Sequence, residues 1–240
     1  WATREGEPTP NFNAALGVWE VYGYHDIQTV LGDAKTFSSD LSDGKMMVFM
    51  DPPRHTQFRR LVARAFTSKV IADLEPSVQA ITDALLDRVE SSGRMDLVTD
   101  LAFPLPVWVI CDLLGVPESD RDRFAHWSDS LLNLTRYTQQ EMETAQREFA
   151  AYMAAHIAAR RAEPGDDLLS ELVIATDAEG RGLSDAELAA TGQGLLIAGH
   201  ETTANMIAKM TGMLLADRRR WERLLADRSL VRTAVEEALR

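Results

Sequence analysis

The sequence predicts a mainly α-helical protein with one small β-sheet. Apolar residues recur at helical spacing along most of the 240 residues, and only the segment 11–22 has the side-chain pattern of β-strands. No proline follows Ser184, so one helix can run from there to about Ala216, roughly 30 residues or ~45 Å. With 45% hydrophobic residues, the chain can bury a large core.

Composition excludes several classes of protein. The net charge of −12, from 25 Lys plus Arg and 37 Asp plus Glu, argues against a nucleic-acid partner. No apolar run approaches the ~20 residues that span a bilayer, and no segment resembles a signal peptide, so we expect no membrane partner and a cytoplasmic protein. A single cysteine, Cys111, excludes an internal disulfide. Its apolar surroundings predict a core residue rather than a metal ligand, whereas His126 and His156 are predicted at the surface.

The N-terminal part begins with the expected hairpin. Residues 11–22 predict two short strands that turn at Leu16 and Gly17, and a short helix is expected from His25 to about Gly32. A loop from Phe37 to Phe49 follows, and from Leu41 onward it has room for about one helical turn. The loop ends in an apolar cluster of four residues, Met46, Met47, Val48 and Phe49.

A basic helix is predicted next, over residues 54–69. Asp51-Pro52-Pro53 is a strong helix start, because proline is tolerated in the first turn and a carboxylate favours the helix dipole. Between Asp51 and Lys69 lie five Lys or Arg residues and one acid. His55 and Arg59 share one face, and Arg60 and Arg64 share another. The helix is either a solvated basic face or an anion site on one face with a docking surface on the other.

Further helices follow one another to the end of the chain. Apolar stripes, caps and breakers predict helices over 70–89, 103–114, 117–134, 141–161, 165–175 and 218–226, a connection over 93–100, and a last helix capped by Ser229.

The long helix that starts at Ser184 organises the chain. Ser184 and Glu187 form a capping box at its start. Its glycines each cost about 0.8–1 kcal/mol relative to alanine, so other groups must approach the helix backbone closely. Four such positions occur: Gly192, Gly194, Gly199 and Gly212.

Two polar residues, Glu201 and Thr202, stand in the apolar middle of this helix. A buried carboxylate without partners costs several kcal/mol, so its presence needs a functional reason unless it is turned to solvent. The hydroxyl of Thr202 can bond the carbonyl of Ala198 one turn earlier. His200-Glu201 begins like the zinc motif H-E-x-x-H, but position 204 is alanine, so no zinc site is predicted.

Three motifs, in order, resemble the cytochrome P-450 family of haem-thiolate monooxygenases. Ala198-Gly199-His200-Glu201-Thr202-Thr203 resembles the oxygen-activating helix. The stretch from Met50 through Asp51-Pro52-Pro53-Arg54-His55 to Val62 resembles the helix that binds the haem propionates. Glu237 and Arg240 resemble the Glu-x-x-Arg signature and are spaced for an ion pair on one face.

The resemblance implies a cytochrome P-450-like helical fold with a small β-sheet. Residues 1–240 would be a single incomplete domain, truncated before the haem-thiolate loop, so that the cysteine ligand of iron lies beyond Arg240 and the chain itself holds no metal ligand. Haem b would lie against Ala198 and Gly199, with its propionates on His55 and Arg59. The substrate pocket would be lined by the apolar cluster 46–49 and by Leu195.

The implied reaction is insertion of one atom of dioxygen into a hydrophobic small molecule. Glu201 and Thr202 would deliver protons, and electrons would come from NAD(P)H through a ferredoxin or similar acidic partner at the basic helix 54–69. The fragment alone is expected to be inactive. Two alternatives are a degenerate haem-binding protein and a cofactor-free helical interaction module, against which the acid–alcohol pair and the glycines argue.

Overall fold

The computed structural model describes residues 10–40, 45–64, 66–133, 135–176 and 180–240. The chain divides into two compact units, Trp1–Arg59 and Arg60–Arg240. The prediction of a single domain over residues 1–240 is not tested by this division.

The first unit contains the predicted hairpin. Strand β1 (Asn11–Asn13) pairs antiparallel with β2 (Val18–Glu20), and Gly17 in the turn has a φ of +66°, which glycine adopts without steric cost. Helix α1 (Tyr24–Gly32) follows, as predicted. The apolar cluster forms a single 3-10 turn, η1 (Met47–Phe49), and residues 41–44 of the predicted loop lie outside the described residues.

The prediction of one basic helix over 54–69 is wrong. Helix α2 (Arg54–Arg64) ends at Arg64, and α3 (Ser68–Asp73) begins afresh with the Thr67 hydroxyl accepting from the Val70 amide. Ala65, between them, lies outside the described residues.

The predicted helix over 70–89 is also interrupted. Pro76 lies in the first turn of α4 (Glu75–Glu90), where its missing amide hydrogen costs no helix bond. The predicted connection over 93–100 instead leads into a π-helical turn, η2 (Val98–Ala102).

The next helices agree with the sequence pattern. Helix α5 (Pro104–Leu113) holds the buried Cys111, and Gly115 after it has a φ of +65°. A 3-10 turn, η3 (Glu118–Asp120), precedes α6 (Arg121–Leu132), and then come α7 (Gln139–Ala162) and α8 (Leu168–Ile174).

The two histidines on α6 and α7 differ in burial. His126 is exposed, as predicted. His156, predicted at the surface, is buried, because its Nε2 lies 2.8 Å from the carbonyl oxygen of Leu114 and this hydrogen bond compensates for the loss of water.

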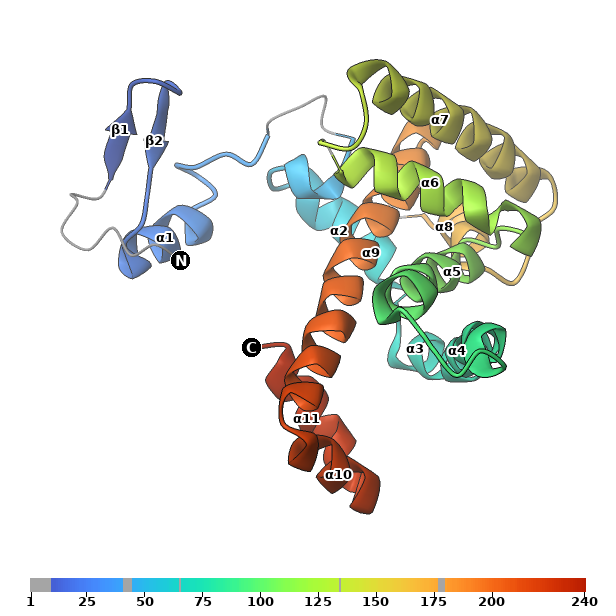
Figure 1. Cartoon of the computed structure of the whole chain (residues 1–240). Coiled ribbons are helices and arrows are strands. Elements are labelled where there is room, and N and C mark those ends of the chain that lie inside the picture. The colour runs from blue at the N-terminus through green and yellow to red at the C-terminus, as the bar shows by residue number, and fades with distance from the viewer. Residues whose placement is uncertain (1–9, 41–44, 65, 134, 177–179) are drawn as a thin grey trace. The chain divides into compact units, whose positions relative to one another are not determined.

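Helix α9 (Asp185–Ala216) is the predicted organising helix, 32 residues long, and both bonds of its capping box form. It packs against α5, α6, α7 and α8 (Figure 1). A Cβ at Gly192 would lie 2.7 Å from Met153 of α7, and one at Gly199 would lie 2.9 Å from Ile110 of α5. Two of its glycines therefore permit close helix packing.

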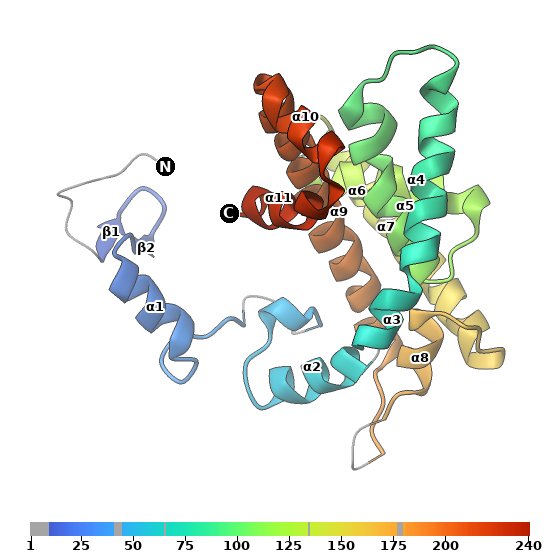
Figure 2. The same ribbon diagram turned by 90° about the horizontal axis from the view of Figure 1, so that it is seen from below.

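Two short helices pack on the C-terminal part of α9 (Figure 2): α10 (Arg218–Ala226) and α11 (Val231–Ala238). The prediction that Ser229 caps the last helix is wrong. A 3-10 turn, η4 (Arg228–Leu230), intervenes, and the Asp227 carboxylate accepts from the Ser229 amide.

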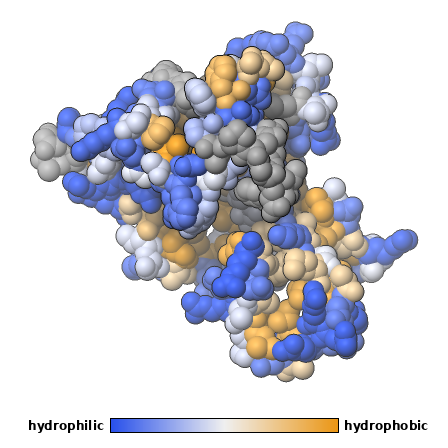
Figure 3. All heavy atoms as spheres, turned by 90° about the vertical axis from the view of Figure 1, so that its left-hand side faces the viewer, coloured by the Kyte–Doolittle hydropathy of each residue, from blue (hydrophilic) through white to orange (hydrophobic). Residues whose placement is uncertain are grey.

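The core of the second unit is apolar and aromatic. Its fully buried side chains include Leu85, Val107, Phe124, Trp127, Met153, Ile157, Leu188 and Leu196. Apolar side chains also remain on the surface around α10 and α11, among charged ones, in the lower part of Figure 3. Within the described ranges, no helix combines the length and hydropathy that a bilayer crossing requires.

Candidate functional site

The predicted catalytic residues lie on the exposed side of one turn of α9, residues 198–202, which we call the acid–alcohol turn. The Thr202 hydroxyl donates to the Ala198 carbonyl oxygen over 2.6 Å, which confirms the predicted bond. Ala198, Glu201 and Thr202 are exposed, Gly199 is half-buried, and Leu195 one turn earlier is half-buried.

Of the two alternatives for Glu201, a buried carboxylate or one turned to solvent, the structure shows the second. Helix α9 turns a different face, marked by Leu196, His200 and Ala204, toward the neighbouring helices. Successive side chains advance by about 100° around a helix, so Glu201 falls beside this buried face and Thr202 almost opposite His200.

From the sequence, His200 was considered as a zinc ligand and rejected, and its role in packing was not predicted. Its side chain is 1% exposed, its Nδ1 lies 2.5 Å from the Ser128 hydroxyl of α6, and its Nε2 has no hydrogen-bond partner of good geometry among the described residues. Burial lowers the pKa of His200, opposed by the nearby backbone of Phe103 and by the charges of Asp129 and Glu201. The imidazole is therefore held neutral near pH 7. An ionisable residue in an apolar helix was the available signal.

The predicted propionate partners lie on α2, in the first unit. Arg59 is exposed and has no ion-pair partner in the part of the chain that the structure describes, whereas His55 is half-buried. Asp51 at the start of the helix accepts from the Ser38 hydroxyl over 2.5 Å and from the Ser39 amide over 2.8 Å. These two bonds, above all that from Ser38, lower the pKa of the Asp51 carboxyl.

The predicted pocket residues 46–49 also belong to the first unit. Met46, Met47 and Phe49 are half-buried, and Val48 is 63% exposed. Their convergence with Leu195 and with the acid–alcohol turn stays a prediction.

The predicted signature pair lies on and after α11. Arg240 Nη1 lies 3.5 Å from Glu237 Oε2, which confirms that the two side chains share a face, and both are exposed. Glu237 also lines a hollow of about 360 Å³ between α9, α10 and α11. An exposed pair at this distance contributes little to stability, ~0–1 kcal/mol.

The two cations of the predicted docking face of α2 differ in their contacts. Arg60 is exposed, whereas Arg64 donates from Nη1 to the Thr176 carbonyl oxygen over 3.0 Å. Arg64 is thus partly committed to an internal contact, and Arg60 is the freer cation of the predicted docking face.

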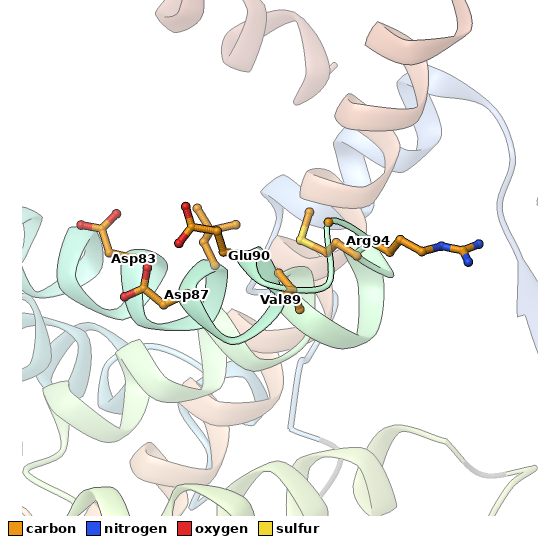
Figure 4. A pocket seen from close by; sticks show the side chains of 8 residues that line it. Asp83, Asp87, Val89, Glu90 and Arg94 are labelled. Carbon is orange, nitrogen blue, oxygen red and sulfur yellow. The ribbon is translucent and has the colours of Figure 1, made fainter.

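A second hollow, of about 410 Å³, lies at the end of α4 (Figure 4), and no predicted site residue is among those that line it. Asp83, Asp87 and Glu90 line it with Arg94. In the described residues no cluster of three or more His, Cys, Asp or Glu side chains could hold a metal ion. We therefore do not interpret this hollow as a metal site.

The residues present fit one face of a haem and one of its propionates, but they do not fit the role of iron ligand. The acid–alcohol turn offers a small, exposed surface at Ala198, and Arg59 offers an exposed cation for a carboxylate. Cys111 does not fit the role of iron ligand, because burial raises the pKa of its thiol to about 12 and the side chain is 0% exposed. The chain supplies groups for the haem face and a propionate, and no accessible thiolate.

No family model matches the chain, but comparisons with individual proteins are informative. It is 37% identical to erythromycin C-12 hydroxylase of Saccharopolyspora erythraea over an alignment of 254 residues. The alignment covers 100% of this chain and 63% of that protein. A cytochrome P450 hydroxylase from the leinamycin biosynthetic pathway of Streptomyces atroolivaceus has a TM-score of 0.83 at 38% identity, covering 92% of this chain and 58% of that one.

A third similar structure is CYP109E1 of Bacillus megaterium in complex with corticosterone, with a TM-score of 0.84 at 39% identity. The match covers 96% of this chain and 63% of that one. A cofactor-free interaction module finds no support among these relatives. The chain spans about three fifths of the length of the relatives it matches, with their helical fold, and it belongs to the cytochrome P450 family.

Proposed function

We propose that the chain is the N-terminal and central part of a haem-dependent monooxygenase that hydroxylates a hydrophobic small molecule. The observation that carries the proposal is the exposed side of the acid–alcohol turn, with Glu201 and Thr202 exposed beside Ala198. Haem b, when bound with a cysteine ligand supplied from outside these residues, would supply the activation of dioxygen.

In this proposal the roles of the chain's own residues follow from their chemistry. Arg59 and His55 hold the haem propionates by charge-assisted hydrogen bonds. The Thr202 hydroxyl holds a proton at the reacting oxygen, and the Glu201 carboxylate exchanges protons with solvent because it is exposed and ionisable. Leu195 and the cluster 46–49 exclude water from the substrate.

Support for an apolar substrate comes from two sides. The proposed wall is made of Met, Val, Phe and Leu side chains, which offer no hydrogen bond to a polar substrate. One relative is named for erythromycin, and the structure of another, CYP109E1, is a complex with corticosterone. Electrons are proposed to come from NAD(P)H through an acidic ferredoxin-type partner that docks on α2 around Arg60.

Substitution of Thr202 by alanine in the full-length enzyme tests the central role. Thr202→Ala should still consume oxygen and reductant, but should divert them to hydrogen peroxide and give less hydroxylated product. The measurement is product formed per reductant consumed, with Thr191→Ala as control, since Thr191 makes the same kind of bond to the Glu187 carbonyl within α9. A wild-type ratio in Thr202→Ala would reduce Thr202 to a structural residue.

Glu201→Gln should behave differently. A neutral amide cannot relay protons by ionising, so turnover should fall while the product ratio changes less. General acid–base contributions are typically about 10²–10⁴-fold, which exceeds the effect expected from altering an exposed side chain. Turnover within twofold of wild type would exclude Glu201 from proton delivery.

A further inference from the structure

A buried hydrogen bond joins α6 to the buried side of the acid–alcohol turn of α9. Ser128 Oγ lies 2.5 Å from His200 Nδ1, and the two side chains are 0% and 1% exposed. The imidazole also packs edge-on against Phe103, which joins η2 to α5, with ring centroids 4.2 Å apart. Three helical segments therefore meet at one side chain of α9.

This bond differs in kind from the other contacts in the middle of the helix. Among the residues that the structure describes, no other side-chain hydrogen bond joins the stretch 188–212 of α9 to another helix. The rest of the buried face is apolar, at Leu188, Leu196 and Ala204. Apolar burial is non-directional, whereas a hydrogen bond weakens steeply away from its preferred angle. At the first residue of α9, Arg161 of α7 donates from Nε and Nη2 to Asp185 Oδ1 over 2.9 and 2.7 Å. The Ser128–His200 bond is thus the directional contact that resists rotation in the middle of α9, next to Glu201 and Thr202.

Rotation of α9 would move the acid–alcohol turn. Glu201 follows His200 directly, and Thr202 lies two residues on, about 200° around the helix. Because these residues share one rigid backbone, holding the imidazole on the buried side fixes the direction in which the Thr202 hydroxyl points. That hydroxyl is already held toward the Ala198 carbonyl over 2.6 Å.

Histidine is an expensive choice at this position. Its buried Nε2 has no hydrogen-bond partner of good geometry among the described residues, although the Phe103 backbone lies close enough to act on the ring. A group left wholly unsatisfied costs about 1–3 kcal/mol, so a poorly satisfied one costs up to that amount. A phenylalanine or leucine would fill the space without this cost. We propose that Ser128 and His200 are positioning residues, which set the rotation of α9 and thereby aim Glu201 and Thr202; the catalytic use of that aim rests on the proposed function.

The test compares three variants of the full-length, haem-loaded enzyme: Ser128→Ala, His200→Phe and His200→Asn. The first two remove the bond, whereas asparagine keeps a polar atom near the place of Nδ1. We expect amide hydrogen exchange over residues 198–206 to speed up about five- to tenfold in the first two, which corresponds to loss of one hydrogen bond. Product per reductant should fall about fivefold in both, and asparagine should restore both quantities to within twofold.

Leu196→Ala is the matched control, because it empties an equally buried site on the same face without touching the bond. It should lower thermal stability but leave product per reductant unchanged. Equal exchange and equal product ratio in all variants, or no rescue by asparagine, would overturn the positioning role. The exchange measurement does not depend on turnover. It therefore decides whether Ser128 and His200 hold α9 even if the Thr202→Ala experiment refutes the proposed function.

Discussion

His200 shows how one residue links burial to pH. Desolvation lowers its pKa below the ordinary value of 6.5, against the weaker effects of the Phe103 backbone, Asp129 and Glu201. The unfolded chain therefore binds a proton more readily than the folded chain in the window below pH 6.5. Stability contributed by the neutral imidazole is present above that pH and is lost as pH falls toward the folded pKa.

We predict that the free energy of unfolding of the wild-type protein falls more steeply between pH 7 and pH 5 than that of His200→Asn. A single proton contributes a slope of at most about 1.4 kcal/mol per pH unit. Denaturant unfolding at several pH values measures it, with His126→Asn as control because His126 is exposed. If His200→Asn and wild type show parallel curves, the imidazole does not titrate with unfolding.

At the scale of the element, the expectation that other groups approach the glycines of α9 closely is confirmed at Gly199 and wrong at Gly212. A Cβ at Gly199 would lie 2.9 Å from Ile110 Cδ1, whereas a Cβ at Gly212 would meet no atom within 4 Å. Gly212 is exposed, so only helix propensity acts there.

Gly212→Ala should therefore stabilise the protein by about 0.8–1 kcal/mol. Gly199→Ala should be less stable than Gly212→Ala by about 1–3 kcal/mol, because the new methyl group overpacks against Ile110. Thermal or denaturant unfolding measures the difference. Equal increases in the free energy of unfolding of the two variants would mean that α5 shifts without cost to make room for the methyl group.

Local signals predicted most of the elements, although several of their ends were wrong, and they failed where distant residues decide. The capping box of Ser184 and Glu187 gave the start of α9 because both partners lie within one turn. Proline at position 76 was overlooked as the start of a new helix. The bond between Ser128 and His200 joins residues 72 apart in sequence, so no periodicity could predict it.

In the candidate site too, local features could be predicted from the sequence and features set by distant residues could not. The Thr202 bond to the Ala198 carbonyl could be predicted because it is local to one helical turn. The outward direction of Glu201 could not, because it depends on which face of α9 meets α5, α6 and α7. Family motifs supplied the roles of His55 and Arg59, which geometry within their own unit does not reveal.

For the whole molecule, charge governs how an acidic redox partner could approach a protein of net charge −12. Steering depends on the local field of α2, which a single substitution can alter. Arg60→Glu is preferable to a change at Arg64, because Arg64 also holds the Thr176 carbonyl.

In the full-length protein, Arg60→Glu should slow reduction by an acidic ferredoxin and flatten its dependence on ionic strength. Arg147→Glu on α7 changes the net charge equally and should leave both unaltered. Stopped-flow reduction across salt concentrations measures the effect. Equal behaviour of the two variants would refute docking at α2.

A second expectation for the whole molecule concerns iron ligation. Residues 1–240, expressed alone with haem, should not give the red-shifted ferrous–carbonyl spectrum of a thiolate-ligated haem, because their only cysteine is buried with a pKa of about 12. The difference spectrum measures this directly. Appearance of the red-shifted band would mean that Cys111 reaches the iron.

Because its only thiol is buried, this part of the protein should not react with sulfhydryl reagents. Nucleophilic attack requires an accessible thiolate, and at neutral pH Cys111 offers neither access nor charge. A maleimide dye would therefore report only on cysteines placed deliberately at the surface. Pairs of labels on α9 and α6 could then follow distance changes between these helices without removing the native cysteine.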